Sequence, residues 1–144
     1  MKLFNLEGKN AVLLGGGGVL GTTMATGLAQ AGANVAVCDL REELAIEAAK
    51  KCEALGVKSK GYILNAMDFN ATQGICSEII KDFGKVDILV NAVGGNMKDA
   101  TTSDTVSFFD LSREAIEKVV GLNLMGGAVL PSQVFGREMI KNSD

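Results

Sequence analysis

The sequence predicts an α/β fold, in which a doubly wound parallel sheet is covered by helices on both faces. Short apolar runs alternate with longer segments of helical period along the 144 residues. The first apolar run ends in a block of glycines, and a helix-length segment separates each run from the next. Strands that alternate with helices pair in parallel through right-handed crossovers. We expect the strand order 3-2-1-4 with further strands downstream, so that residues 1–144 form one domain that is incomplete at its C-terminal end.

Each element follows from a local pattern. Four apolar runs predict strands at residues 11–14, 35–38, 62–64 and 86–90. Segments of helical period predict helices at residues 20–31, 41–55, 70–83 and, as a long final helix, about 112–140. An Asn70–Gln73 capping box is expected to open the third helix, and Pro131 is expected to kink the last one. Residues 94–111 have no clear period and are long for a connection, so we expect a functional loop there.

Composition excludes several classes of function. The net charge is −3, without a basic cluster, so neither nucleic acid nor a membrane surface is expected as a partner. The N-terminus carries no apolar run of signal-peptide length, and we expect a cytoplasmic protein. The three cysteines, Cys38, Cys52 and Cys76, lack metal-ligand spacing, so no metal site is expected. The absence of histidine excludes histidine-dependent catalysis within these residues.

The glycine block between the first strand and the first helix indicates a phosphate-binding turn. Residues 16–21 fit the pattern GxGxxG. Without side chains the backbone can approach a pyrophosphate, whose charge then faces the free N–H groups of the helix. A tight turn without any ligand is the alternative. We expect cofactor contacts from this turn, at Gly15, Gly17, Gly18, Val19, Leu20 and Gly21.

Asp39 closes the second strand, at the place where a dinucleotide fold binds the ribose hydroxyls through a carboxylate. Leu40 is expected to lie beside the cofactor with it. Asp39 and Glu42 also fit a capping box for the second helix, and the two roles can coexist. A carboxylate repels a 2′-phosphate, which favours NAD over NADP, although Arg41 could pair with such a phosphate. A methyltransferase would share the features described so far.

The fourth strand distinguishes between these classes. Residues 87–94 resemble the D-x-L-V-N-N-A-G signature of the short-chain dehydrogenases/reductases, and residues 15–21 resemble that family's TGxxxGxG motif. The resemblance implies a Rossmann-type fold with bound NAD. It also implies cofactor contacts at Asp68, Phe69, Asn91, Ala92 and Val93.

Asn123 resembles the helix asparagine of the family's catalytic tetrad, which organises a water in a proton relay. A buried helix asparagine, or a C-terminal cap, is the alternative. The family's serine and its YxxxK motif have no counterpart here, because the only tyrosine is Tyr62 and position 66 is alanine. We therefore expect the cofactor-binding front part of an NAD-dependent oxidoreductase, inactive as residues 1–144 alone. A non-catalytic dinucleotide-binding or sensor module is the alternative.

The resemblance further implies a small-molecule substrate with a carbinol or ketone carbon. The loop at 95–102 is similar to that of members acting on sugar acids of the fructuronate/mannonate kind, with Lys98 as the candidate carboxylate partner. We also expect a homo-oligomer, a dimer or a tetramer, through the last helix. There Ile116, Val119 and Val120 recur at helical spacing, and Gly126 and Gly127 would allow close approach of another helix.

Overall fold

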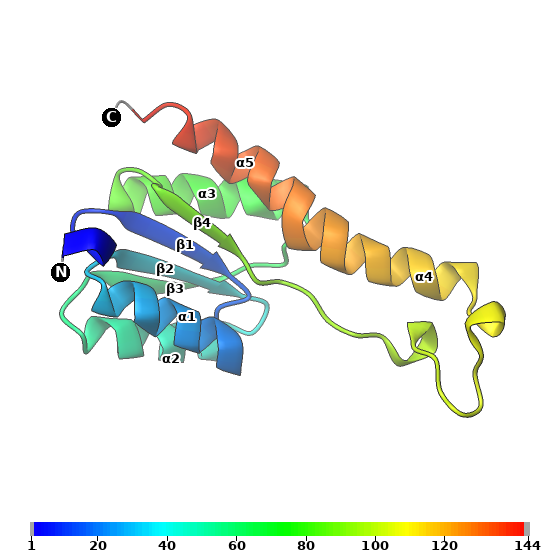
Figure 1. Ribbon diagram of the computed structural model, residues 1–144. Helices are drawn as coiled ribbons and strands as arrows, with labels where there is room; N and C mark the ends of the chain where they lie inside the picture. Colours follow the sequence, from blue (N-terminus) through cyan, green and yellow to red (C-terminus); the bar gives the residue numbers. More distant parts are fainter. Residues whose placement is uncertain (1, 143–144) are drawn as a thin grey trace.

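The computed structural model describes residues 2–142 and contains one parallel sheet with the strand order β3-β2-β1-β4 (Figure 1). The strands are β1 (Asn10–Leu14), β2 (Asn34–Asp39), β3 (Ser59–Ile63) and β4 (Ile88–Asn91). In the register, Val12 of β1 lies opposite Ala36 of β2 and Leu89 of β4. The predicted fold class and strand order are confirmed. The boundaries differ by up to three residues, since β3 begins before its apolar run.

Helices cover both faces of the sheet (Figure 1). One face carries α1 (Val19–Gln30) and α2 (Glu42–Glu53), and the other carries α3 (Phe69–Phe83) and α5 (Leu130–Met139). Side chains alternate along a strand, so β1 serves both cores. Leu13 packs among the alanines of α1 and α2, whereas Val12 and Leu14 pack with Phe135 of α5. Burial on both faces explains why these strands read as continuous apolar runs.

The third helix begins earlier than predicted. Asp68 is its N-cap, and the Asp68 carboxylate accepts a hydrogen bond of 3.0 Å from the backbone N–H of Ala71. The predicted capping pair, Asn70 and Gln73, therefore lies inside the helix. A carboxylate both accepts from the free N–H groups and interacts favourably with the helix dipole, which makes Asp68 the better cap.

The last helical run consists of α4 (Arg113–Val120), the π-helical segment η4 (Gly121–Val129) and α5. It starts as predicted, with the hydroxyl of Ser112 accepting from the N–H of Ala115 at 3.1 Å. The run is unbroken in Figure 1, and its irregular segment, η4, ends two residues before Pro131. The kink at Pro131 stays a prediction. Wider turns before a proline accommodate the missing N–H.

Two glycines of η4 pack closely against other segments of the same chain. A Cβ at Gly126 would collide with the sulfur of Met67, and one at Gly127 would lie 2.5 Å from the carbonyl oxygen of Val93. The expectation that these glycines admit a second helix of another copy is therefore wrong. They let the helical run approach the ends of β3 and β4 in the same chain.

The helical run also has the length and composition of a membrane span. Residues Arg113–Met139 form a 27-residue helix that passes this test, and within residues 2–142 it is the one helix to do so. A helix that packs in the core of a soluble protein passes the same test. Phe135 of this helix is completely buried against the sheet.

An asparagine joins the amino ends of the strands. The backbone N–H of Asn10 donates to Oδ2 of Asp87 at 2.9 Å, and its side-chain amide donates to the carbonyl oxygens of Phe83 and Lys85 at 3.0 Å. Burial raises the pKa of Asp87, but the Lys85 ammonium at 2.7 Å and the Asn10 N–H outweigh it, and the pKa lies below its usual value. Polar contacts thus fix the amino ends of β1 and β4.

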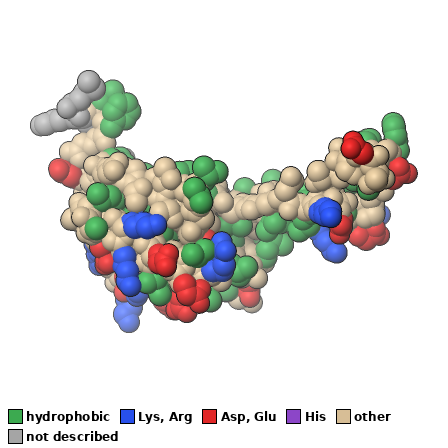
Figure 2. Space-filling view, turned by 90° about the horizontal axis from the view of Figure 1, so that it is seen from below, with side chains coloured by type: hydrophobic (Ala, Val, Ile, Leu, Met, Phe, Trp, Pro, Cys, Tyr) green, Lys and Arg blue, Asp and Glu red, His purple; other side chains and the backbone are tan. Residues whose placement is uncertain are grey.

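Between β4 and α4 the chain forms an arm that projects from the body (Figure 1). Its only helical turns among the described residues are Lys98–Ala100 and Phe108–Asp110, so the predicted irregular loop is confirmed. Phe108 and Phe109 pack edge to face at 5.8 Å, and Phe109 is 91% exposed. Figure 2 shows acidic and basic side chains mixed over the body and the arm on the face in view.

Candidate functional site

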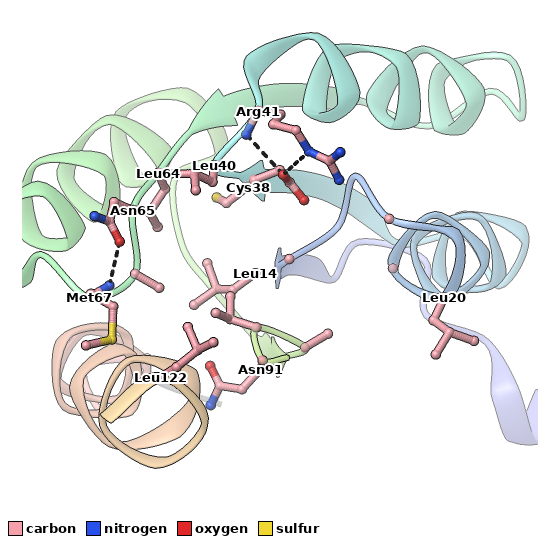
Figure 3. Close-up of a pocket in the computed structure, with 18 of the residues that line it drawn as sticks. Leu14, Leu20, Cys38, Leu40, Arg41, Leu64, Asn65, Met67, Asn91 and Leu122 are labelled. Atoms are coloured by element: carbon pink, nitrogen blue, oxygen red, sulfur yellow. Dashed lines mark hydrogen bonds and ion pairs between the residues drawn. The ribbon is translucent and has the colours of Figure 1, made fainter. Parts of the chain in front are cut away.

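A cavity of about 810 Å³ opens at the carboxyl ends of the strands (Figure 3). Parallel strands bring these ends to one edge of the sheet, where ligands of open α/β sheets bind. The glycine turn, the ends of β2, β3 and β4, and Leu122 of η4 line the cavity. Ten residues predicted to contact a cofactor are among its lining: Gly15, Gly18, Val19, Leu20, Gly21, Asp39, Leu40, Asn91, Ala92 and Val93.

At two glycines of the turn, backbone atoms leave no space for a side chain. Gly15 has a φ of +76°, and a Cβ there would lie 2.7 Å from the carbonyl oxygen of Ala92 at the end of β4. A Cβ at Gly21 would collide with the carbonyl oxygen of Gly15. Gly18 differs, because no atom lies within 4 Å of the place its Cβ would take. Gly15 and Gly21 therefore allow the backbone of the turn to pack tightly. Gly18 leaves open space on the side of the cavity.

The first turn of α1 presents free N–H groups to the open space beside Gly18. Gly18 is the N-cap and offers no side-chain acceptor, whereas α3 and α4 are capped by Asp68 and Ser112. Free N–H groups at a helix N-terminus, together with the helix dipole, attract an anion. Val19 and Leu20 are also 86% and 77% exposed at the cavity. The donors and the open space fit a diphosphate.

Asp39 connects the end of β2 to the glycine turn. Its Oδ2 accepts from the N–H of Gly17 at 2.9 Å. Its Oδ1 accepts from the N–H of Arg41 at 3.0 Å and lies 3.9 Å from the guanidinium Nε, two contacts of Arg41 that Figure 3 marks with dashed lines. Gly17 is therefore held behind the carboxylate and does not line the cavity. Each carboxylate oxygen can accept more than one hydrogen bond, so both remain able to bind hydroxyl groups.

The predicted capping box of Asp39 and Glu42 does not form. The N-cap of α2 is Arg41, and no side chain caps this helix. The carboxylate of Asp39 turns toward Gly17 and the backbone of Arg41 instead. The geometry therefore excludes the capping box, and the binding of the ribose hydroxyls by Asp39 stays a prediction.

The structure does not bring Asp68 and Phe69 to the cavity. The carboxylate of Asp68 caps α3, and the lining after β3 consists of residues 64–67. Among them, Asn65 accepts a hydrogen bond from the N–H of Met67 at 3.1 Å (Figure 3). Sequence reasoning missed Asn65, two residues after the end of β3, because the family resemblance was placed on Asp68 and Phe69.

Asn123 is brought to the root of the arm and does not line the cavity. Its Oδ1 accepts from the N–H of Gly95 at 3.0 Å, and its Nδ2 donates to the carbonyl oxygens of Gly95 and Val119 at 2.9 Å. A Cβ at Gly94 would lie 2.5 Å from this Oδ1. The side chain thus connects the segment after β4 to the helical run, and the role of Asn123 in a proton relay stays a prediction.

The described residues offer no evident acid or base at the cavity, where Asp39 and Arg41 are the only charged lining residues. Tyr62 lies elsewhere, and its hydroxyl donates to Asp82 at 2.7 Å. Burial, and then the hydrogen bond to Asp82, raise the pKa of Tyr62, opposite to what an acid/base tyrosine needs. Within residues 2–142 no group of three or more possible ligands could hold a metal ion.

Comparison with known proteins agrees with this geometry. Residues 9–144 match the model of the short chain dehydrogenase family. An uncharacterized oxidoreductase of Haemophilus influenzae is 39% identical, over 94% of this chain and 51% of its own length. A 2-dehydro-3-deoxy-D-gluconate 5-dehydrogenase of Pseudoalteromonas atlantica is 32% identical, over 97% of this chain and 52% of its own.

The solved structures give the same result. A proposed D-mannonate oxidoreductase from Haemophilus influenzae with bound NAD superposes with a TM-score of 0.84 at 38% identity. The match covers 94% of this chain and 51% of that one. This chain thus spans about half the length of the curated relatives it matches. It belongs to the short-chain dehydrogenase family.

Proposed function

We propose that this chain is the cofactor-binding part of an NAD-dependent oxidoreductase that transfers hydride between the nicotinamide and a carbinol or ketone carbon. The observation that carries the proposal is the cavity where the open side of Gly18, the uncapped start of α1 and the Asp39 carboxylate meet. NAD, which is bound in the 38%-identical neighbour, supplies the redox chemistry when it is present. The residues of this chain bind and orient it.

Each part of the cavity suits one part of the dinucleotide. The free N–H groups at residues 18–20 would hold the diphosphate, and Asp39 would accept the hydroxyls of the adenosine ribose. Residues 64–67 would contact the adenine, and residues 91–94 would contact the nicotinamide ribose. The apolar residues of the lining would exclude water from the bound cofactor.

For the whole protein we propose a sugar acid as the substrate class. The names of two relatives, a 2-dehydro-3-deoxy-D-gluconate 5-dehydrogenase and a proposed D-mannonate oxidoreductase, support it. Lys98 lies on the arm that follows residues 91–94 of the cavity, and its exposed ammonium could pair with a substrate carboxylate.

The cytoplasmic location stays a prediction.

The homo-oligomer also stays a proposal, and its contact surface is assigned to exposed apolar side chains of the last helical run. Ile116, Val120 and Leu124 lie one helical turn apart and are 43%, 45% and 52% exposed. We expect sedimentation velocity to show a dimer or larger species at micromolar concentration, and Ile116→Glu to shift it toward the monomer. Lys118→Glu adds the same negative group on exposed helix surface and serves as the control. A strict monomer of the unmodified chain would contradict the proposal.

Replacing Asp39 should weaken NADH binding and reduce the preference for NADH over NADPH. Asp39→Ala removes hydrogen bonds to the ribose worth roughly 1–3 kcal/mol, or roughly a five- to 150-fold loss of affinity. Fluorescence titration of both reduced cofactors measures this. Asp68→Ala is the matched control, because this acid caps α3 outside the cavity and should leave the affinity unchanged. Equal or tighter binding of NADPH by the unmodified chain would refute the NAD preference.

A side chain at Gly18 should block the diphosphate and spare the fold. Gly18→Val finds no atom within 4 Å of its Cβ, so we expect an unchanged melting temperature and a loss of NADH affinity of at least about tenfold. Gly15→Val should instead lower the melting temperature, because a Cβ at position 15 meets Ala92 and the φ is +76°. Unaltered NADH binding by folded Gly18→Val would show that the diphosphate lies elsewhere.

Residues 1–144 alone should show no dehydrogenase activity. Without a positioned acid/base the proton-transfer step loses roughly 10²–10⁴-fold in rate, and the cavity lining offers neither a tyrosine nor a histidine. The test supplies NAD with secondary alcohols and sugar acids and follows the absorbance of NADH. Turnover at a normal enzymatic rate would show that residues 1–144 contain the active site and that our assignment of it is wrong. A longer chain carrying Ser and YxxxK should be active, and its inactivity would favour the sensor alternative.

A further inference from the structure

A hydroxyl of the helical run holds the side chain of a residue that lines the cavity. Asn91 is the last residue of β4, and its Nδ2 donates to Oγ of Ser132, in the first turn of α5, at 3.0 Å. Asn91 lines the cavity, whereas Ser132 does not. Ser132 can therefore act on the cavity only through the amide of Asn91.

The packing of α5 on β4 brings these two side chains together. Side chains alternate along a strand, so Asn91 points to the same face of the sheet as Leu89, which packs in the core that contains Phe135 of α5. Ser132 lies three residues before Phe135 and hence on the same face of the helix. Figure 1 shows that α5 and β4 run in opposite directions. One step from Leu89 and Phe135 toward the carboxyl end of β4 therefore places the hydroxyl over the amide.

The hydrogen bond decides which end of the amide faces the cavity. An asparagine amide carries two donors on its nitrogen and an acceptor on its oxygen, and turning the amide exchanges them. Because Ser132 accepts from the nitrogen, the oxygen of Asn91 stays on the cavity side, where Figure 3 shows it. Asn91 thus presents a hydrogen-bond acceptor, and the ligand group that it binds has to be a donor.

The position of β4 in the sheet indicates which ligand group this is. β2 and β4 flank β1 on opposite sides, so the proposed dinucleotide would extend from the start of α1 to Asp39 on one side and to Asn91 on the other. Its diphosphate carries only acceptor oxygens, and the adenosine ribose is assigned to Asp39. The ribose that carries the nicotinamide has hydroxyl groups, which can donate.

We propose that Ser132 is a positioning residue, which holds the amide of Asn91 so that Oδ1 of Asn91 accepts a hydrogen bond from a hydroxyl of the nicotinamide ribose. This inference rests on the proposed function and adds to it a residue outside the cavity. Without the hydroxyl of Ser132 the amide can turn and present its N–H groups instead. Part of the binding free energy would then be spent on ordering the amide.

Titration calorimetry with ADP and ADP-ribose tests the proposal on the 144-residue chain, because ADP lacks the second ribose. Ser132→Ala should weaken the binding of ADP-ribose about three- to tenfold and leave that of ADP unchanged. Ser132→Thr keeps the hydroxyl and should retain the native affinity. Unchanged affinity for ADP-ribose, equal losses for both ligands, or a loss confined to NADH would overturn the proposal. Failure of the proposed function has a different signature, because the unmodified chain would then bind neither ADP nor NADH.

A second serine and a double variant separate positioning from stability. Ser77 is likewise exposed, on α3, and its hydroxyl donates to the carbonyl oxygen of Gln73 in its own helix at 3.0 Å, so Ser77→Ala should change neither affinity. In an Asn91→Ala background, Ser132→Ala should cause no further loss, because its effect passes through Asn91.

Nuclear magnetic resonance of the unliganded chain tests the hydrogen bond without a cofactor. The side-chain amide hydrogens of Asn91 should exchange with solvent faster in Ser132→Ala than in the native chain, because their acceptor is lost. An unaltered exchange rate, or an additional loss of ADP-ribose affinity in the double variant, would contradict the role of Ser132.

Discussion

The contact between Gly15 and the end of β4 is the constraint on which the cavity depends. The chain leaves β1 in a left-handed conformation and passes Ala92 so closely that no Cβ fits. Gly21, in the first turn of α1, must also lack a side chain, because a Cβ there would collide with the carbonyl oxygen of Gly15. These two contacts set the direction of α1. As a result, the free N–H groups of its first turn face the cavity at the carboxyl ends of the strands.

Asp39 couples this turn to the rest of the sheet. Its carboxylate accepts from the N–H of Gly17 while remaining at the cavity, so the group proposed to bind the ribose also holds the turn proposed to bind the diphosphate. Two parts of one binding site are then positioned by a single hydrogen-bonded side chain. Such preorganisation lowers the cost of ordering the site when a ligand binds.

Polar residues show where sequence reasoning fails. Asp68 and Asn123 both carry groups suited to a binding site, yet one caps α3 and the other fastens Gly95 to the helical run. Asn65 and Met67 were not predicted, and they line the cavity. A polar side chain takes the partner that folding brings within reach, and residue type and spacing do not specify that partner.

The amino-acid sequence by itself determined the alternation of elements, the parallel sheet and the glycine turn with Asp39, because hydrophobic period and turn chemistry are local properties of the chain. The tertiary structure decided the rest: the π-helical segment before Pro131, the intramolecular use of Gly126 and Gly127, and the open side of Gly18. These features depend on the space left between elements that are distant in sequence. That space follows from packing at close to crystal density, which no local pattern encodes.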